Sequence, residues 1–346
     1  MSLQTLLGTQ FPIIQAPMAG AQGSALAIAV CQAGGLGSLP CAMLSSEQIE
    51  REVAAIRAAT DRPFNLNFFC HMSPEPDAER EANWRRRLST YYAEFGIDPD
   101  KIQPGAGRQP FSAEIADIVE PLRPPVVSFH FGLPEPALLE RVKSWGSRVL
   151  SSATTVEEAL WLEERGVDAI IAQGVEAGGH RGMFLSEDLS TQLGTFALVP
   201  QIVAAVQVPV IAAGGIADVA GVGAAMKLGA QGVQIGTAYL CCPESTISEL
   251  HRRALMSSAA QHTALTNLFS GRPARGIMNR VMRELGPICA DAPAFPSATT
   301  AIAPLRAAVE ARGYGDFSPL WSGQNASGCR PIPAAELTRQ LASGLE

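Results

Sequence analysis

Residues 208–218 have the sequence Val-Pro-Val-Ile-Ala-Ala-Gly-Gly-Ile-Ala-Asp, and residues 232–237 have the sequence Gly-Val-Gln-Ile-Gly-Thr. Each stretch contains a short apolar run that ends at glycine, and a helix-like segment from Asp218 to Leu228 lies between them. Short apolar runs that alternate with helical periodicity are typical of βα units with buried parallel strands. This part of the chain therefore predicts an α/β fold.

The same alternation extends back to the N-terminus. Further parallel strands are predicted at residues 13–16, 35–39, 64–68, 126–129, 148–151 and 169–172, and further helices at residues 24–33, 45–59, 135–144 and 155–165. Eight parallel strands with intervening helices are the count of a TIM barrel. An open, doubly wound sheet is the alternative, because strand count alone does not establish closure.

Two regions fall outside the alternation. Residues 71–123 form an insert after the third strand, which is longer than one crossover helix needs. Residues 243–312 are predicted to be mainly helical, and residues 313–346 to return to the barrel. The barrel itself is then made of residues 1–70 and 124–242. We expect the segment 243–312 to form a smaller, substrate-side domain over the C-terminal ends of the strands.

Composition and charge narrow the class of protein. The 346 residues carry a net charge of −7, which argues against a nucleic-acid or anionic-membrane surface. No run of about 18 apolar residues predicts a membrane span. Residues 1–5 lack the features of a secretory signal, and the seven cysteines include no CxxC pair. We expect a cytoplasmic protein with a small-molecule partner, and a homodimer is possible.

The loop Ala172–Gly182 is the strongest candidate for chemistry. It follows an apolar strand and contains four glycines and His180. Glycine lacks Cβ, so a flat ligand can approach such a loop closely. Histidine titrates near neutral pH and can transfer a proton or hold an anion. His180 is therefore the catalytic candidate, although a glycine-rich surface loop with an incidental histidine would have the same sequence.

A phosphate site is predicted after the last two strands, where barrels commonly bind phosphate. Gly214 and Gly215 follow the seventh strand, and residues 234–237 (Gln234, Ile235, Gly236 and Thr237) end the eighth. The glycines expose backbone N–H groups, Asp218 can cap the next helix, and Thr237 offers a hydroxyl. Tight turns without a ligand are the alternative.

Polar or small residues also end several other strands. Ala16, Pro17 and Met18 follow the first strand, and Asn67, His130 and Gln173 end the third, fourth and sixth. Each polar residue could also be a satisfied core group, but parallel strands place all of them at one end of the barrel. No HxxxH, CxxC or facial carboxylate pattern predicts a metal site, and no GxSxG motif predicts a hydrolase triad.

These blocks resemble a known family. Residues 14–18, 172–182, 212–216 and 234–237 are similar to the nitronate monooxygenases, formerly called 2-nitropropane dioxygenases. The longer blocks 67–71, 128–134, 173–184 and 320–324 resemble the class I, bacterial-type branch, and the resemblance runs from about residue 10 to residue 330.

The resemblance implies a TIM barrel that binds FMN and oxidises nitronates with O2 to carbonyl compounds and nitrite or nitrate, without NAD(P)H. It implies that Gly214, Gly215, Gly236 and Thr237 hold the phosphate and that His180 faces the substrate. It further implies that the flavin is lined by Ala16, Pro17, Met18, Asn67, Gln173, Gly178 and Gly179. His130 would contact the substrate anion or support its neighbours.

One stretch departs from the family pattern. Residues 295–300, Phe-Pro-Ser-Ala-Thr-Thr, stand where the family has tyrosines and a lysine, so a less polar substrate cavity is expected. Two other functions stay open at this point. One is an FMN-dependent NAD(P)H reductase of the quinone or enoyl-acyl-carrier type, and the other is a non-catalytic binding module on a barrel scaffold.

Overall fold

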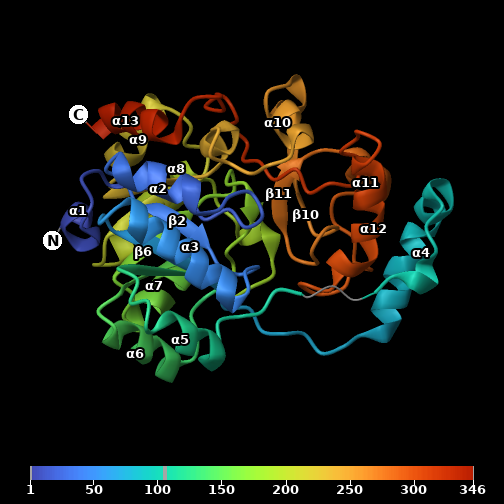
Figure 1. The fold of residues 1–346 in the computed structure, drawn as a ribbon, viewed down its shortest axis with the longest axis horizontal. Helices are drawn as coiled ribbons and strands as arrows, with labels where there is room; N and C mark the ends of the chain where they lie inside the picture. The colour runs from blue at the N-terminus through green and yellow to red at the C-terminus, as the bar shows by residue number, and fades with distance from the viewer. Residues whose placement is uncertain (1, 104–106, 346) are drawn as a thin grey trace.

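Eight parallel strands form the centre of the structure, a computed structural model that describes residues 2–103 and 107–345 (Figure 1). Their order is β1-β9-β8-β6-β5-β4-β3-β2. The strands are β1 (Ile13–Gln15), β2 (Gly37–Pro40), β3 (Phe64–Phe69), β4 (Val126–His130), β5 (Arg148–Ala153), β6 (Ala169–Gln173), β8 (Val210–Ala213) and β9 (Gly232–Ile235). All eight predicted strands are present, displaced by at most two residues at either end.

The sheet closes between β1 and β2. Leu36 N donates to Ile13 O at 2.8 Å, and Gln15 N donates to Leu36 O at 3.0 Å. These bonds join the two ends of the strand order, so the fold is a TIM barrel and the open-sheet alternative is wrong. At the N-terminal end of the barrel, Leu3 of α1 (Leu3–Leu7) is fully buried among apolar residues that include Ile14 and Ile211.

Helices surround the barrel and bury their apolar faces against it. They are α2 (Ser24–Gln32), α3 (Ser46–Ala59), α5 (Ala113–Val119), α6 (Pro136–Ser144), α7 (Val156–Glu164), α8 (Thr195–Ala205) and α9 (Val219–Lys227). Side-chain caps set several N-termini, such as the Ser45–Gln48 capping box of α3. The helix α8 is not predicted from the sequence, because its apolar residues and internal Pro200 obscure the helical period.

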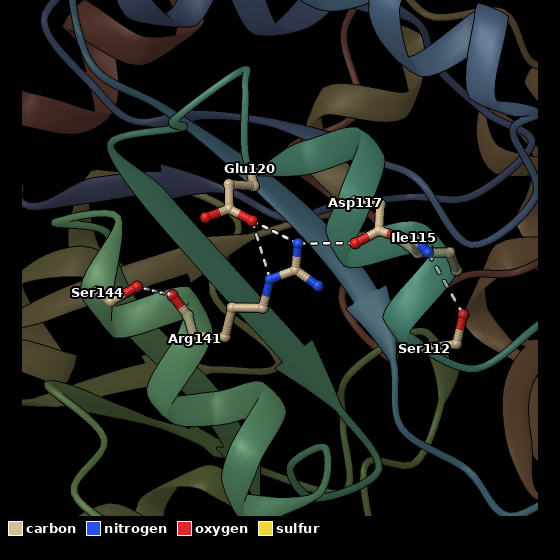
Figure 2. A network of polar contacts seen from close by, with 6 residues as sticks. All are labelled: Ser112, Ile115, Asp117, Glu120, Arg141 and Ser144. Atoms are coloured by element: carbon tan, nitrogen blue, oxygen red, sulfur yellow. Dashed lines mark hydrogen bonds and ion pairs between the residues drawn. The ribbon is translucent and has the colours of Figure 1, made fainter.

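Neighbouring outer helices are also joined by ion pairs. Arg141 of α6 contacts Asp117 of α5 and Glu120 just beyond it, and its Nε donates to Glu120 Oε2 at 2.9 Å (Figure 2). Ser112 caps the start of α5 by accepting from Ile115 N. Such partly exposed pairs contribute at most about 1 kcal/mol each. They fasten the outer layer and lie outside the candidate site.

A second apolar cluster lies beside the barrel. It joins α4 (Ala78–Phe95), from the insert, to α12 (Ala298–Glu310), and the two helices run side by side (Figure 1). Trp84 Nε1 donates to Ala298 O at 3.3 Å, and the Tyr92 hydroxyl donates to Ala301 O at 2.7 Å. Segments about 200 residues apart thus share one core.

The segment 243–312 also contains strands that the sequence analysis did not predict. Besides α10 (Glu249–Leu255), α11 (Arg280–Leu285) and α12, it holds β10 (Thr263–Thr266) and β11 (Ala274–Ile277). β11 pairs antiparallel with β10 and with β7 (Gly179–His180), so a strand of the glycine-rich loop belongs to this sheet. The C-terminal helix α13 (Ala334–Ala342) packs on α2 and α9. The division of the chain into domains stays a prediction.

No helix in the described ranges combines the length and apolar character needed to cross a membrane.

Candidate active site

A cavity of about 440 Å³ opens at the C-terminal ends of the barrel strands. This volume lies in the range of small-molecule sites, about 300–1,000 Å³. The predicted site residues that line it are Ala16, Pro17, Met18, Asn67, His130, Gln173, Gly178, Gly179, His180, Gly214, Gly215, Gln234, Gly236 and Thr237. Ile235 does not line it: successive strand residues face opposite sides, and Ile235 packs in the outer apolar core.

The glycines after β8 and β9 form one end of the cavity. Gly214 and Gly215 have φ values of +115° and +73°, which residues with a Cβ rarely adopt. In the described part of the chain, the backbone N–H groups of Gly215, Gly236 and Thr237 have no hydrogen-bond partner. Unpaired N–H groups close to the start of α9 provide a site for an anion.

The segment 320–325, for which no role is predicted from the sequence, completes this end of the cavity. Gly323 N donates to Thr237 Oγ1 at 2.9 Å, and Asn325 Nδ2 donates to Gly215 O at 3.0 Å. A Cβ on Gly178 would lie 2.5 Å from Gly323 N. Gly178 is therefore needed for the close approach of two backbone segments, a requirement separate from the approach of a ligand. The block 320–324 was the only sequence signal for this contact.

His180 lies in the cavity wall on β7, with its ring partly accessible to the cavity but deep below the protein surface. Its Nε2 lies 2.8 Å from Ser270 Oγ. Burial holds the pKa of His180 well below its usual range, and the Arg108 guanidinium is the leading charge that lowers it further. The imidazole is therefore neutral at physiological pH. Nδ1 has no partner among the described residues and is the nitrogen left for a substrate.

His130 and Gln173 hold the backbone of His180 in place. His130 Nε2 donates to His180 O at 3.2 Å, and its Nδ1 lies 3.0 Å from Ser152 Oγ. Gln173 Nε2 donates to the same His180 carbonyl at 3.0 Å. Because both ring nitrogens of His130 have protein partners, the geometry favours a supporting role over the predicted substrate contact. Burial lowers the pKa of His130 to about 4.

Arg181 fixes the turn behind the catalytic loop. Its side chain is fully buried, and its guanidinium donates to Gly174 O and Gln173 O, each at 2.7 Å, and to Gln192 Oε1 at 2.9 Å. Burial lowers the pKa of Arg181 to about 10. A buried cation with these donors satisfied by carbonyl oxygens is a structural element of the loop.

The substrate side of the cavity is aromatic and cationic. The rings of Phe131 and Phe295 lie 6.0 and 5.3 Å from the ring of His180. The aromatic residues that line the cavity are Phe69 and Trp321, and the guanidinium of Arg108, a residue with no predicted role, lines it as well. The less polar cavity expected from residues 295–300 stays a prediction. Among the described lining residues the one carboxylate is Glu310, which is hydrogen-bonded to Arg306 and Ser318.

The buried histidines predict a loss of stability in acid. Burial lowers the pKa of His71, His130 and His251 to about 4 and holds that of His180 well below its usual range. Below about pH 6.5 the unfolded chain takes up protons that the folded chain refuses, so the free energy of unfolding falls between pH 6.5 and pH 4. Each histidine contributes a slope of up to about 1.4 kcal/mol per pH unit. Denaturant unfolding at pH 7.0, 6.0 and 5.0 measures this slope, and constant stability over that range would contradict it.

Comparisons with known proteins agree with this geometry. The family model described as nitronate monooxygenase matches residues 1–344. The chain is 44% identical to a nitronate monooxygenase of Pseudomonas aeruginosa, over 98% of this chain and 97% of the relative. It is 43% identical to one of Paraburkholderia phytofirmans, over 98% and 93%.

Two solved structures are also similar. Nitroalkane oxidase from Streptomyces ansochromogenes has a TM-score of 0.90 and 37% identity, with 100% of this chain and 98% of that chain covered. FabK from Thermotoga maritima has a TM-score of 0.74 and 26% identity, with 99% and 96% covered. Because the family model and these relatives match nearly its whole length, the chain belongs to the nitronate monooxygenase family of oxidoreductases.

Proposed function

We propose that this protein is an FMN-dependent enzyme that oxidises alkyl nitronates with O2 to carbonyl compounds and nitrite or nitrate, without consuming NAD(P)H. Family membership and the likeness to a nitroalkane oxidase support oxidation of nitronates as the reaction. A cytoplasmic location and a homodimer stay predictions.

The residues of the cavity fit FMN. The unpaired N–H groups of Gly215, Gly236 and Thr237 suit a phosphate, which needs several donors at one point. Gln234 Oε1 is a buried acceptor with no partner in the described chain, and a ring N–H could satisfy it. Ala16, Pro17, Met18, Asn67, Gln173, Gly178 and Gly179 would line the ring system. Bound FMN would supply an acceptor for the electrons of the substrate.

The observation that carries the proposal is a neutral imidazole inside a cationic cavity. His180 is uncharged, while Arg108 and Arg272 lie close enough to lower its pKa. A positive environment favours an anionic substrate over a neutral one, because few carboxylates compete for it. A nitronate is such an anion. The rings of Phe131 and Phe295, which lie 5.5 Å apart, give His180 apolar neighbours.

The Ser270 hydroxyl can support both tautomers of His180. When it donates to His180 Nε2, at 2.8 Å, Nδ1 carries the proton and can donate to a nitronate oxygen. When it donates instead to Arg272 O, at 3.3 Å, Nδ1 is a free base that could remove the α-proton of a neutral nitroalkane. For a preformed nitronate, His180 has only to position the anion.

An anaerobic absorption spectrum tests the proposal. The purified protein is expected to have a flavin spectrum that changes on mixing with ethyl nitronate and does not change with NADH or NADPH. Rapid bleaching by a nicotinamide nucleotide would instead support the reductase alternative. A protein refolded or reconstituted with FMN that still shows no flavin absorbance would contradict the proposed cofactor.

A further inference from the structure

One cation in the substrate cavity lacks a counterion. The Arg108 guanidinium lines the cavity, and its one side-chain hydrogen bond to a described residue runs from Nη1 to Thr299 Oγ1 at 3.3 Å. No carboxylate of the described chain lies within ion-pair distance of it. Its carbon Cζ lies 5.5 Å from the centroid of the Phe295 ring.

The other arginines near the site either have more partners than Arg108 or do not line the cavity. Arg181 donates to three oxygens, and Arg275 donates to Val175 O and to Thr263. Arg306 lines the cavity but is paired with Glu310. Arg272, like Arg108, makes one hydrogen bond, to Met183 O, and one aromatic contact, but it does not line the cavity. A guanidinium has five N–H donors, and Arg108 uses one of them on the protein.

This arrangement is costly unless an anion completes it. Burial lowers the pKa of Arg108, and nearby Arg306 lowers it further, so both solvation and neighbouring charge oppose the cation. A partly desolvated charge is stabilised when an opposite charge with good hydrogen-bond geometry joins it. The planar fork of arginine matches the two oxygens of a carboxylate.

Arg108 and His180 both lie next to the ring of Phe295. Arg108 Cζ is 5.5 Å and the centroid of the His180 ring is 5.3 Å from its centroid. His180 offers its free nitrogen to the reacting group, so Arg108 is positioned for a second anionic group on the same small molecule. We propose that Arg108 is a specificity-determining residue that binds the carboxylate of short nitronates carrying one. This rests on the proposed function. Arg108, which lies in the insert, would supply the positive charge that residues 295–300 lack.

Two nitronates of equal chain length distinguish binding of the carboxylate from binding of the nitronate group. Propionate 3-nitronate carries a carboxylate, and propyl 1-nitronate does not. In Arg108→Met we expect kcat/KM for propionate 3-nitronate to fall about 10- to 100-fold, mainly through KM, while that for propyl 1-nitronate changes by less than about threefold. Arg108→Lys should keep part of the preference, because it retains the charge without the fork.

Arg85→Met is the matched control, because Arg85 lies in the same insert and its guanidinium donates to Pro99 O at 2.9 Å, outside the cavity. This variant should leave kcat/KM for both nitronates unchanged. An equal loss with both nitronates in Arg108→Met would overturn the proposal and assign Arg108 to the nitronate group. Unchanged kinetics with both would overturn it as well.

A binding measurement is independent of turnover. 3-Nitropropionate carries the carboxylate but is not a nitronate. It should raise the Tm of the FMN-loaded wild-type protein but not the Tm of Arg108→Met. 1-Nitropropane, which lacks the carboxylate, should raise the Tm of either protein by less than 3-nitropropionate raises that of the wild type. If the wild-type protein oxidises neither nitronate, the proposed function fails, and this shift alone decides the inference. Equal shifts in the two proteins would overturn it.

Discussion

His180→Asn is expected to retain FMN but to lower kcat/KM for ethyl nitronate by about 10² to 10⁴-fold, the usual contribution of a positioned acid–base group. The imidazole provides the free nitrogen at the substrate end of the cavity, and the asparagine amide is too short to replace it while still bonding Ser270 at 2.8 Å. The backbone carbonyl of residue 180, which His130 and Gln173 hold, is unchanged by the substitution. Oxygen consumption gives the kinetics, and visible absorbance gives the flavin content.

Two further variants serve as comparisons for His180→Asn. Ser270→Ala removes the partner of Nε2 and should reduce the rate by roughly tenfold, because it loosens the ring without deleting it. His262→Asn changes a histidine outside the cavity lining and should leave turnover unchanged. Unchanged turnover in His180→Asn would remove His180 from the mechanism.

Gly178→Ala is expected to lose most of its bound FMN and to unfold at a lower temperature. The added Cβ would lie 2.5 Å from Gly323 N and 2.6 Å from the carbonyl carbon of Ser322, so backbone would have to move. That movement breaks the hydrogen bond from Gly323 N to Thr237 Oγ1 at the predicted phosphate site. Overpacking of this kind costs about 1–3 kcal/mol. The ratio of flavin to protein and the Tm measure both effects.

Gly96→Ala provides the matched comparison. Gly96 has φ of +70°, but a Cβ there would meet no atom within 4 Å, and the residue ends α4 away from the cavity. Gly96→Ala should lower the free energy of unfolding by about 1 kcal/mol, because alanine disfavours the left-handed backbone. Its flavin content should be unchanged. A Gly178→Ala protein with full flavin content and the Tm loss of Gly96→Ala would contradict the close-approach argument.

Some features of this protein are determined locally and could be predicted. The eight strands were predicted because short apolar runs such as Val210–Ala213 alternate with capped helices such as α9. Parallel strands all end at one side of the barrel, so residues as distant in sequence as Met18, His180 and Thr237 could be placed at one cavity from strand ends alone.

Other features depend on contacts between segments with no shared periodicity. Only the tertiary structure pairs β7 with β11 and brings Ser270 to His180. It likewise places Arg108 over Phe295. It also shows that Gly178 makes room for Gly323 and that His130 holds a carbonyl. Hydrophobic periodicity and capping residues predict the structure of one helix or strand at a time. The contacts above join segments about 50 to 190 residues apart. Their geometry is set only when the barrel and the second apolar cluster pack together.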